Sequence, residues 1–405
     1  MATLCMDFGT SNTAAALLAD GATRVIALEP GRTTMPTAVF LDFADRRMLI
    51  GHEAAQAMME GRDGRFLRAL KSVLGTPLAR EPRQLMNERL TLVEVIGRFL
   101  REIRARAEAA TGQRFERALS GRPVRFHSAS EARDAQALAD LTEAYALAGF
   151  EAVDFLPEPE AAALAVGGDG RCLIVDIGGG TSDFTLCDRR DGQTQVLAST
   201  GIRLGGTDFD KWLSLGHAMP LLGYGATIGN ELGDGGHTAP RALFHDLASW
   251  EKIAFVYDPA TLREVRRWQR LAPEPHLFAR LGEVLDSHLG HDVAYAVEAA
   301  KIAANSSSAG VIDLGVVERG LRAELSHGAL MAELFEAAER IGDCAQAALA
   351  QAGCRADQVD RVVFVGGSSL LAVVQARLGA LFPGARLETS EVFTAVVDGL
   401  ALATR

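Results

Sequence analysis

One short pattern occurs twice in this chain and limits the possible folds more than any other feature. Residues 6–13 read M-D-F-G-T-S-N-T, and residues 175–183 read V-D-I-G-G-G-T-S-D. Each copy follows a short apolar run, which is typical of a buried strand that ends in a glycine-rich turn. The copies lie much further apart in sequence than the repeats of a solenoid. The pattern therefore predicts a duplication, with two similar α/β lobes and a cleft between them.

The segments after each motif repeat one order, in which further strands are followed by helices. Apolar periodicity and the positions of glycine and proline predict these elements. The predicted strands include 3–7, 13–18, 24–28, 117–120, 124–127, 171–177, 183–187, 195–201, 310–314, 321–325 and 362–365. The predicted helices include 90–110, 130–148, 158–166, 293–304, 329–352, 369–382 and 394–404.

A glycine-rich stretch at 167–170 separates the two predicted lobes. Lobe I is expected over residues 1–168, with an inserted subdomain at about 36–90. Lobe II is expected over 169–405, with an inserted subdomain at about 211–308. This division agrees with the length, since 405 residues exceed what one ordinary hydrophobic core organises.

The composition excludes several classes of protein. Charged residues make up 23% and hydrophobic residues 48%, as in folded globular proteins. The net charge of −11 argues against a general binder of nucleic acid or of anionic membranes. No signal peptide pattern is visible, and no apolar run approaches the ~18 residues that span a bilayer. The five cysteines form no C-x-x-C pair, so we expect reduced core thiols in a cytoplasmic protein.

The two repeated loops combine groups that bind phosphates and metal ions. Backbone N–H groups of a glycine turn after a strand converge on anions, and the neighbouring hydroxyls add donors. Two facing loops would bind a polyphosphate from both sides. Carboxylates repel phosphates, so Asp7, Asp176 and Asp183 make sense if a divalent cation lies between them. Mg²⁺, which prefers few carboxylates together with phosphate oxygens and water, fits this pattern.

Four motifs resemble the phosphate and adenosine motifs of the actin-like ATPase superfamily. They are D-F-G-T-S-N at 7–12, D-I-G-G-G-T-S-D at 176–183, L-G-G-T-D-F-D at 204–210 and V-G-G-S-S at 365–369. The chain is most similar to the ATPase domain of the DnaK-type heat shock protein 70 family. This resemblance implies two ribonuclease-H-like lobes related by duplication, each with an inserted subdomain, and a nucleotide cleft between them.

Further segments resemble functional parts of the same family. L-K-S-V-L-G at 70–75 is similar to its catalytic-lysine segment, E-P-E-A-A-A at 158–163 to its first connecting helix, and V-E-A-A-K at 297–301 to its adenosine clamp. The resemblance implies catalytic roles for Lys71, Glu158, Asp176 and Thr181, and Mg²⁺ contacts for Asp7, Asp176 and Asp183. It implies that ATP or ADP is bound by Gly9, Thr10, Ser11, Asn12, Gly178, Gly179, Gly180, Gly205, Gly206, Glu298, Lys301, Asn305, Gly366, Gly367 and Ser368.

Two departures from the family pattern concern the adenosine. Leu370 stands where the family usually has an arginine that stacks on adenine, and Asn305 stands where its clamp helix usually has a serine. Because the sequence ends at Arg405, we expect the chain to lack the family's β-sandwich peptide-binding domain and lid. On this point the chain is similar to truncated, YegD-like members of the family.

The resemblance implies a slow ATPase with a chaperone-like role. Its partners would be the nucleotide and a protein partner or co-chaperone, but no nucleic acid and no membrane. Two alternatives belong to other functional classes. One is a small-molecule kinase of the same superfamily, and the other is a catalytically silent, nucleotide-dependent scaffold or filament protein.

Overall fold

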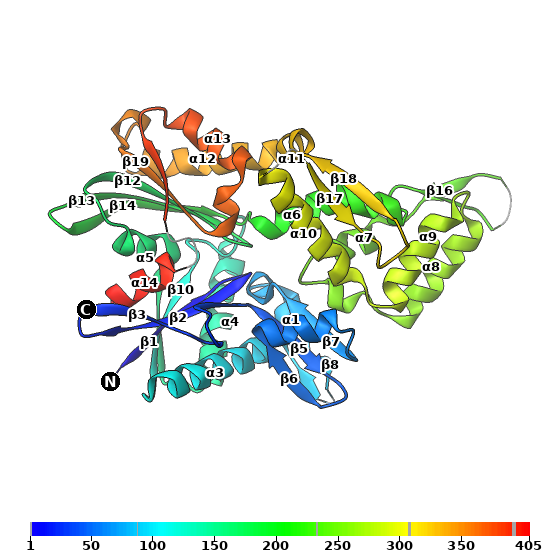
Figure 1. The fold of residues 1–405 in the computed structure, drawn as a ribbon, viewed down its shortest axis with the longest axis horizontal. Helices are drawn as coiled ribbons and strands as arrows, with labels where there is room; N and C mark the ends of the chain where they lie inside the picture. The colour runs from blue at the N-terminus through cyan, green and yellow to red at the C-terminus, as the bar shows by residue number, and fades with distance from the viewer. Residues whose placement is uncertain (1, 87, 232–233, 307–308, 391–393) are drawn as a thin grey trace. The chain divides into compact units, whose positions relative to one another are not determined.

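The computed structural model describes residues 2–405 except 87, 232–233, 307–308 and 391–393 (Figure 1). The chain divides into two compact units. One comprises the residues up to Gly206 together with Ala337–Arg405, and the other is Thr207–Glu336. The glycines of all four turns singled out in the sequence belong to the first unit, whereas residues 207–210 of the third motif belong to the second.

Two mixed sheets in the first unit share one strand order (Figure 1). The order is β11-β10-β1-β2-β3 in one sheet, where β4 also pairs with β2, and β14-β13-β12-β19-β20 in the other. In both, the strand that carries the motif aspartate pairs antiparallel with the next strand and parallel with a later one. The strands are β1 Thr3–Phe8, β2 Asn12–Ala19, β3 Ala22–Ile26, β4 Thr34–Pro36, β10 Arg117–Arg122, β11 Ala152–Pro157, β12 Gly170–Ile177, β13 Ser182–Arg190, β14 Gln193–Ile202, β19 Arg361–Val365 and β20 Arg386–Thr389. The shared topology confirms the predicted fold class, a duplicated α/β lobe.

The helices repeat along with the strands. In the first lobe α3 (Leu92–Thr111) precedes β10, α4 (Glu131–Leu147) joins β10 to β11, and α5 (Glu158–Ala165) follows β11. Helices of the second lobe occupy the same places around β19 and β20. They are α12 Phe335–Gln351, α13 Ala372–Leu381 and α14 Ala395–Leu402.

The long helix α3 shows how local sequence sets an element's bounds. Thr91 and Glu94 form a capping box, in which the Glu94 N–H donates to Thr91 Oγ1 over 3.2 Å and the Thr91 N–H donates to Glu94 Oε2 over 2.7 Å. Gly112 ends the helix at φ 69°, a left-handed conformation that glycine adopts at little cost. The helix therefore begins at Leu92, two residues later than its apolar pattern predicts.

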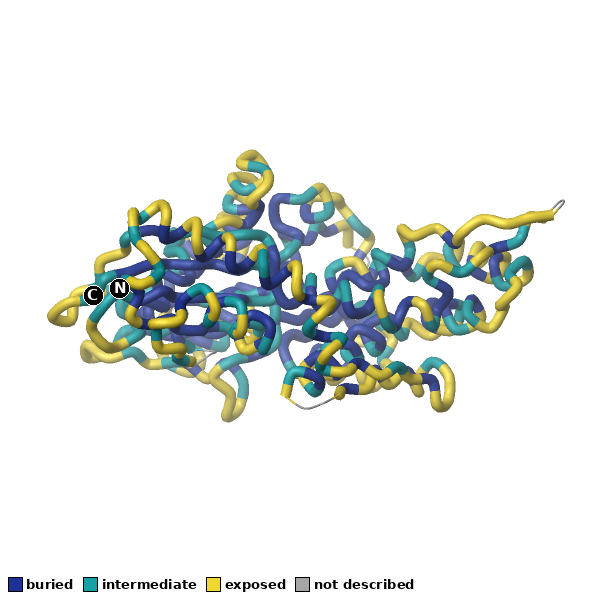
Figure 2. The backbone as a smooth tube through the Cα atoms, turned by 90° about the horizontal axis from the view of Figure 1, so that it is seen from above, coloured by how far each residue is buried: buried dark blue, intermediate teal, exposed yellow. Residues whose placement is uncertain are grey.

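One buried cluster joins both sheets to α5 and α14, which lie beside each other in Figure 1. It contains mostly small residues, such as Ala14 and Ala16 from β2, Ala161–Ala163 from α5, and Ala395 and Ala401 from α14. A Cβ added to Gly399 would lie 1.7 Å from the carbonyl oxygen of Ala161, so the two helices are in backbone contact there. The buried strand segments around this cluster are dark blue in Figure 2.

The segment after β10 corrects one sequence prediction. The predicted strand at 124–127 is wrong, and β10 instead runs unbroken through Gly121 to Arg122. Pro123 follows, and because it has no N–H it cannot donate a hydrogen bond to a neighbouring strand. The N–H of Val124 donates to Asp183 Oδ1 over 2.7 Å and thus serves the site described below.

The remaining elements of the first unit are short. Strands β5, β6 and β7 form a small sheet with α1 beside it, and β8 pairs with β9. Their bounds are β5 Ala38–Asp42, β6 Arg47–Ile50, α1 Gly51–Met59, β7 Gly64–Arg68, β8 Arg83–Leu85 and β9 Glu88–Leu90. Short helices lie at η1 Leu70–Val73, α2 Pro77–Arg80, η5 Ala356–Gln358 and η6 Gly367–Leu370. All five cysteines have free thiols, in line with the sequence prediction.

The second unit is mainly helical. Its helices are α6 Gly206–Leu213, η2 Ser214–Ala218, η3 Met219–Leu222, α7 Arg241–Leu247, η4 Ile253–Phe255, α8 Pro259–Leu271, α9 Pro275–Asp286, α10 Gly290–Ser306 and α11 His327–Glu333. Its strands form the hairpins β15 Thr227–Gly229 with β16 Gly236–Thr238, and β17 Ala309–Asp313 with β18 Arg322–Ser326. The single helix predicted over 329–352 is wrong, because Leu334 separates α11 from α12. Within the described ranges, no helix has the length and apolarity needed to cross a bilayer.

Candidate functional site

The two motif loops have the same local geometry. In the β1–β2 turn the N–H of Gly9 donates to the carbonyl of Asn12 over 3.0 Å. In the β12–β13 turn the N–H of Gly178 donates to the carbonyl of Thr181 over 3.1 Å. A Cβ on Gly9 would lie 2.4 Å from the Asn12 carbonyl oxygen, so this turn closes only around glycine.

These two loops face each other within the first unit. A Cβ on Gly179 would lie 2.6 Å from Ser11 Oγ, and one on Gly180 would lie 3.0 Å from Thr10 Oγ1. The absence of side chains at both glycines is what allows the loops to approach. The structure therefore brings the duplicated motifs together, as the sequence led us to expect.

The other two glycine turns join the same cluster. The N–H of Gly206 donates to the carbonyl of Gly178 over 3.0 Å, and a Cβ on Gly205 would lie 2.6 Å from the carbonyl oxygen of Gly179. Gly366 adopts φ 79°, and a Cβ there would lie 2.9 Å from Asp176 Oδ1. Gly367 and Ser368 begin η6, and Ser368 Oγ would lie 2.4 Å from a Cβ on Gly206.

An acidic cluster and one lysine surround the loops. Lys71 and Glu158 form a buried ion pair, with side chains 6% and 11% exposed. Asp176 and Asp183 are opposite one another in the β12–β13 ladder and are also buried. The Asp183 carboxylate accepts the hydrogen bond from Val124 noted above.

Burial shifts the acid–base properties of these groups. Desolvation, together with repulsion from Glu158, raises the pKa of Asp7 to about 7 and that of Asp183 to about 7. The same two causes raise the pKa of Asp176 well above its usual value. Burial opposes the charge of Lys71, but attraction to Glu158 and Asp7 leaves its pKa raised. The cluster therefore has an excess of carboxylates that protons or a cation would neutralise.

This excess predicts that the nucleotide-free protein loses stability as pH rises. A carboxyl whose pKa is higher in the folded protein takes up a proton on folding, so its contribution falls from about pH 4 to about pH 7, by up to about 1.4 kcal/mol per pH unit. We expect Asp183→Asn, which keeps the acceptor for Val124, to be more stable than wild type at pH 7 and to lose that advantage progressively as the pH falls to about 4. Thermal unfolding of both proteins across this range, without divalent cations, measures the difference. A constant difference would contradict the expectation.

Direct metal coordination by side chains alone finds no support. Within the described part of the chain, no three His, Cys, Asp or Glu side chains lie close enough together to hold a metal ion. A cation bound near Asp7, Asp176 and Asp183 would need other ligands, such as phosphate oxygens and water.

The candidate adenosine residues Glu298, Lys301 and Asn305 all lie on α10, in the second unit. Lys301 is 7% exposed, and its Nζ donates to Asp210 Oδ1 over 2.6 Å. The indole N–H of Trp250 donates to the other oxygen of Asp210 over 3.1 Å. Sequence reasoning missed this role of Asp210, although the residue closes the motif at 204–210.

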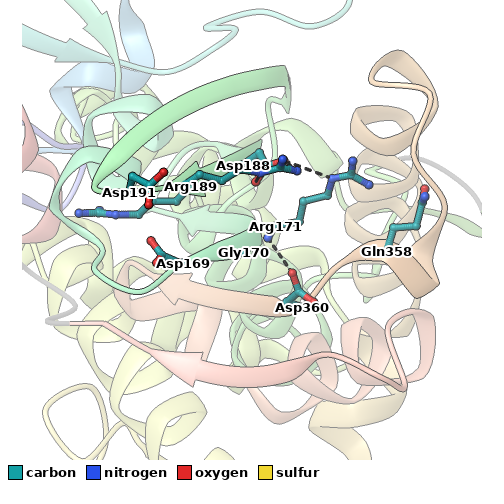
Figure 3. A pocket seen from close by; sticks show the side chains of 9 residues that line it. Asp169, Gly170, Arg171, Asp188, Arg189, Asp191, Gln358 and Asp360 are labelled. Atoms are coloured by element: carbon teal, nitrogen blue, oxygen red, sulfur yellow. Dashed lines mark hydrogen bonds and ion pairs between the residues drawn. The ribbon is translucent and has the colours of Figure 1, made fainter.

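A wider pocket lies apart from the predicted site residues (Figure 3). Its volume is about 530 Å³, and its lining includes three arginines and four aspartates. Asp188 pairs with Arg190 at 2.8 Å and with Arg171 at 3.8 Å, while Asp360 accepts from the Arg171 N–H over 2.8 Å. Two of the three arginines, Arg171 and Arg190, already contact the Asp188 carboxylate, and four aspartates line the pocket, so this surface is a poor anion site.

A duplicated α/β lobe with four glycine turns gathered around buried carboxylates defines the actin-like ATPase fold. The family model described as Hsp70 protein matches residues 3–218. Over 216 residues the chain is 33% identical to the chaperone protein DnaK of Thermoplasma acidophilum, an alignment that covers 51% of this chain. The chain belongs to the Hsp70 family, as its motifs predicted. It spans about a third of the length of that DnaK, because the alignment covers 33% of the relative.

Proposed function

We infer that this chain binds Mg·ATP and hydrolyses it slowly, as a nucleotide-binding module of Hsp70 type. The observation that carries this proposal is the approach of the two mirrored loops, with Gly179 next to Ser11 and Gly180 next to Thr10. Two glycine turns with hydroxyl groups on both sides offer donors to a polyphosphate, and Lys71 lies in the same pocket as Thr10 and Thr181.

The proposed phosphate contacts come mainly from the backbone. Gly9–Asn12 would bind from one side and Gly178–Thr181 from the other, through N–H groups other than those of Gly9 and Gly178, which donate within their own turns, and Gly205 and Gly206 would lie at the third side. Such N–H groups are held in place by the turns before the nucleotide arrives. Preorganised donors of this kind stabilise the charge that develops during phosphoryl transfer.

The carboxylate excess fits a magnesium ion. Asp7, Asp176 and Asp183 would hold it, directly or through water, together with phosphate oxygens. Bound Mg²⁺ would supply neutralising charge for the phosphates and for the buried carboxylates. The carboxylates would in turn fix the position of its water ligands.

Hydrolysis needs a positioned water and a stabilised γ-phosphate. The water oxygen forms a bond to the γ-phosphorus and the bond from that phosphorus to the β–γ bridging oxygen breaks. One proton of the water stays on the phosphate dianion, and the other passes to solvent. Glu158 would orient the water and accept a hydrogen bond from it, while Lys71, held by Glu158, would stabilise the negative charge on the phosphoryl oxygens.

The remaining proposed contacts are those to the nucleoside. The family resemblance assigns adenosine contacts to Gly366, Gly367 and Ser368 in the first unit and to Glu298, Lys301 and Asn305 on α10 in the second. A protein partner or co-chaperone would bind the ATP-bound and the ADP-bound forms with different affinity.

Calorimetry with ATP, ADP and GTP, each with and without Mg²⁺, tests this function. We expect tight, Mg²⁺-dependent binding of ATP and ADP, and release of phosphate from ATP in a separate turnover assay. Absence of binding at millimolar nucleotide would overturn the proposal. Phosphate transfer to a sugar instead of water would favour a kinase, and nucleotide-dependent light scattering without turnover would favour a filament protein.

A side chain placed between the two motif loops should weaken the binding of ATP strongly. We expect Gly179→Ala to weaken ATP binding at least about a hundredfold, or about 2.7 kcal/mol, because the new methyl group would lie 2.6 Å from Ser11 Oγ. Gly282→Ala is the matched control, since nothing lies within 4 Å of its Cβ position. Calorimetric titration of both variants with ATP checks this, and wild-type affinity in Gly179→Ala would refute it.

A further inference from the structure

A small pocket opens beside the candidate phosphate loops. Its lining includes Thr10, Lys71 and Thr181 from the predicted site, and Ser72, His127 and Arg203, to which the sequence assigned no role. The pocket therefore continues from the position proposed for the terminal phosphate toward residues that the proposed ATPase mechanism does not use.

Among these residues, Arg203 carries the charge that remains available to an anion. Its Nη2 donates to the carbonyl of Ser72 over 3.1 Å, and among the described residues its guanidinium pairs with no carboxylate. By contrast, the ammonium of Lys71 is already paired with Glu158. A guanidinium has five N–H donors and cannot lose its charge, so Arg203 retains donors for an anion.

Ser72 adds a second unused donor. Its Oγ is buried and has no hydrogen-bond partner, which is uncommon for a buried hydroxyl. His127 is engaged differently, since its Nε2 lies 2.7 Å from the carbonyl oxygen of Leu74. Burial lowers the pKa of His127, so this ring is neutral at pH 7 and hydrogen-bonds a backbone oxygen.

We propose that Arg203 and Ser72 form a binding site for inorganic phosphate, next to the position of the γ-phosphate. This inference rests on the proposed ATPase function. The phosphate dianion released by hydrolysis would leave the acidic cluster around Asp176, which repels it, and would be held by the guanidinium and the Ser72 hydroxyl. Arg203 would thus delay phosphate release while ADP stays bound.

The pocket in Figure 3 differs from this one, because four aspartates line it and two of its three arginines contact a carboxylate. Arg171 and Arg190 there contact Asp188, whereas Arg203 faces its pocket without an acidic partner among the described residues. Arg189 serves as a matched control, because it also donates to a backbone carbonyl, that of Val166, and lines the pocket in Figure 3 instead of the one beside the phosphate loops.

Phosphate affinity of the ADP complex tests the proposal. We expect Arg203→Ala to weaken binding of ³²P-labelled phosphate, measured by equilibrium dialysis with Mg²⁺ and ADP, at least about tenfold, and Arg203→Lys to weaken it less. Ser72→Ala should weaken it about threefold without loss of stability, because the hydroxyl has no partner to lose. ADP affinity should stay within about twofold in all three variants, and Arg189→Ala should behave as wild type.

Two results would overturn the proposal. One is unchanged phosphate affinity in Arg203→Ala and Ser72→Ala. The other is an equal loss of phosphate and ADP affinity, which would assign Arg203 a purely structural role. If wild type binds no nucleotide, the proposed ATPase function fails separately, and phosphate dialysis against the nucleotide-free variants still decides whether Arg203 and Ser72 form an anion site.

Discussion

Replacing Lys71 with methionine is expected to lower the rate of ATP hydrolysis at least about a hundredfold. Methionine keeps an unbranched apolar stem of similar length but removes the ammonium. The γ-phosphoryl oxygens then lose the cation that would stabilise their charge in the transition state. ADP lacks that phosphoryl group, so its affinity should change by no more than about threefold.

The ion pair with Glu158 complicates this experiment, and a second substitution resolves it. Removing one partner of a buried pair costs about 3–5 kcal/mol of stability, because the other charge stays buried alone. Lys71→Met with Glu158→Gln removes both charges and should recover much of that loss, but not the hydrolysis rate. Single-turnover hydrolysis and thermal unfolding of both variants separate catalysis from folding. Turnover within about threefold of wild type in Lys71→Met would remove this lysine from the mechanism.

Substituting Gly399 with alanine is expected to cause a large loss of stability. The new Cβ would lie 1.7 Å from the carbonyl oxygen of Ala161, so α5 and α14 must move apart. Overpacking of a core typically costs about 1–3 kcal/mol, and a clash with backbone belongs at or above the top of that range. We therefore expect a fall in Tm of several degrees or more.

Gly379→Ala in α13 is the matched control for this experiment. Its Cβ would meet only the end of the flexible Leu387 side chain, at 3.3 Å. Alanine is a better helix former than glycine by about 1 kcal/mol, so this variant should be as stable as wild type or more stable. Equal melting temperatures for the two variants would show that the contact between α5 and α14 is not tight in solution.

The sequence predicted those parts of the molecule that depend on short-range patterns. The duplicated strand, aspartate and glycine turn are contiguous in sequence, so both lobes could be recognised from residues 6–13 and 175–183. The capping box that starts α3 and the left-handed glycine that ends it are also local. The strand predicted at 124–127 failed because tertiary contacts decide there: the Val124 N–H goes to Asp183, 59 residues away.

Roles that depend on partners distant in the sequence could not be assigned from the sequence. Arg203 and Ser72 are 131 positions apart, and only the folded chain places them in one pocket. The same applies to Lys301, whose spacing from Glu298 is typical of a solvated surface pair, whereas its ammonium is buried against Asp210. In each case the role of the residue depends on which polar or charged groups lie next to it in the folded chain.

Helix α5 connects the contact with α14 directly to Glu158 of the candidate site. Glu158 is its first residue, and Ala161, three positions later, rests on Gly399. At 1.5 Å per residue the distance along the axis is about 4.5 Å, so a tilt of about 15° about that pivot would shift the Glu158 backbone by about 1 Å. A displacement of this size is enough to change a catalytic rate about a hundredfold. In the proposed ATPase, a force that displaces α14 would therefore change the rate of hydrolysis without any contact to the nucleotide.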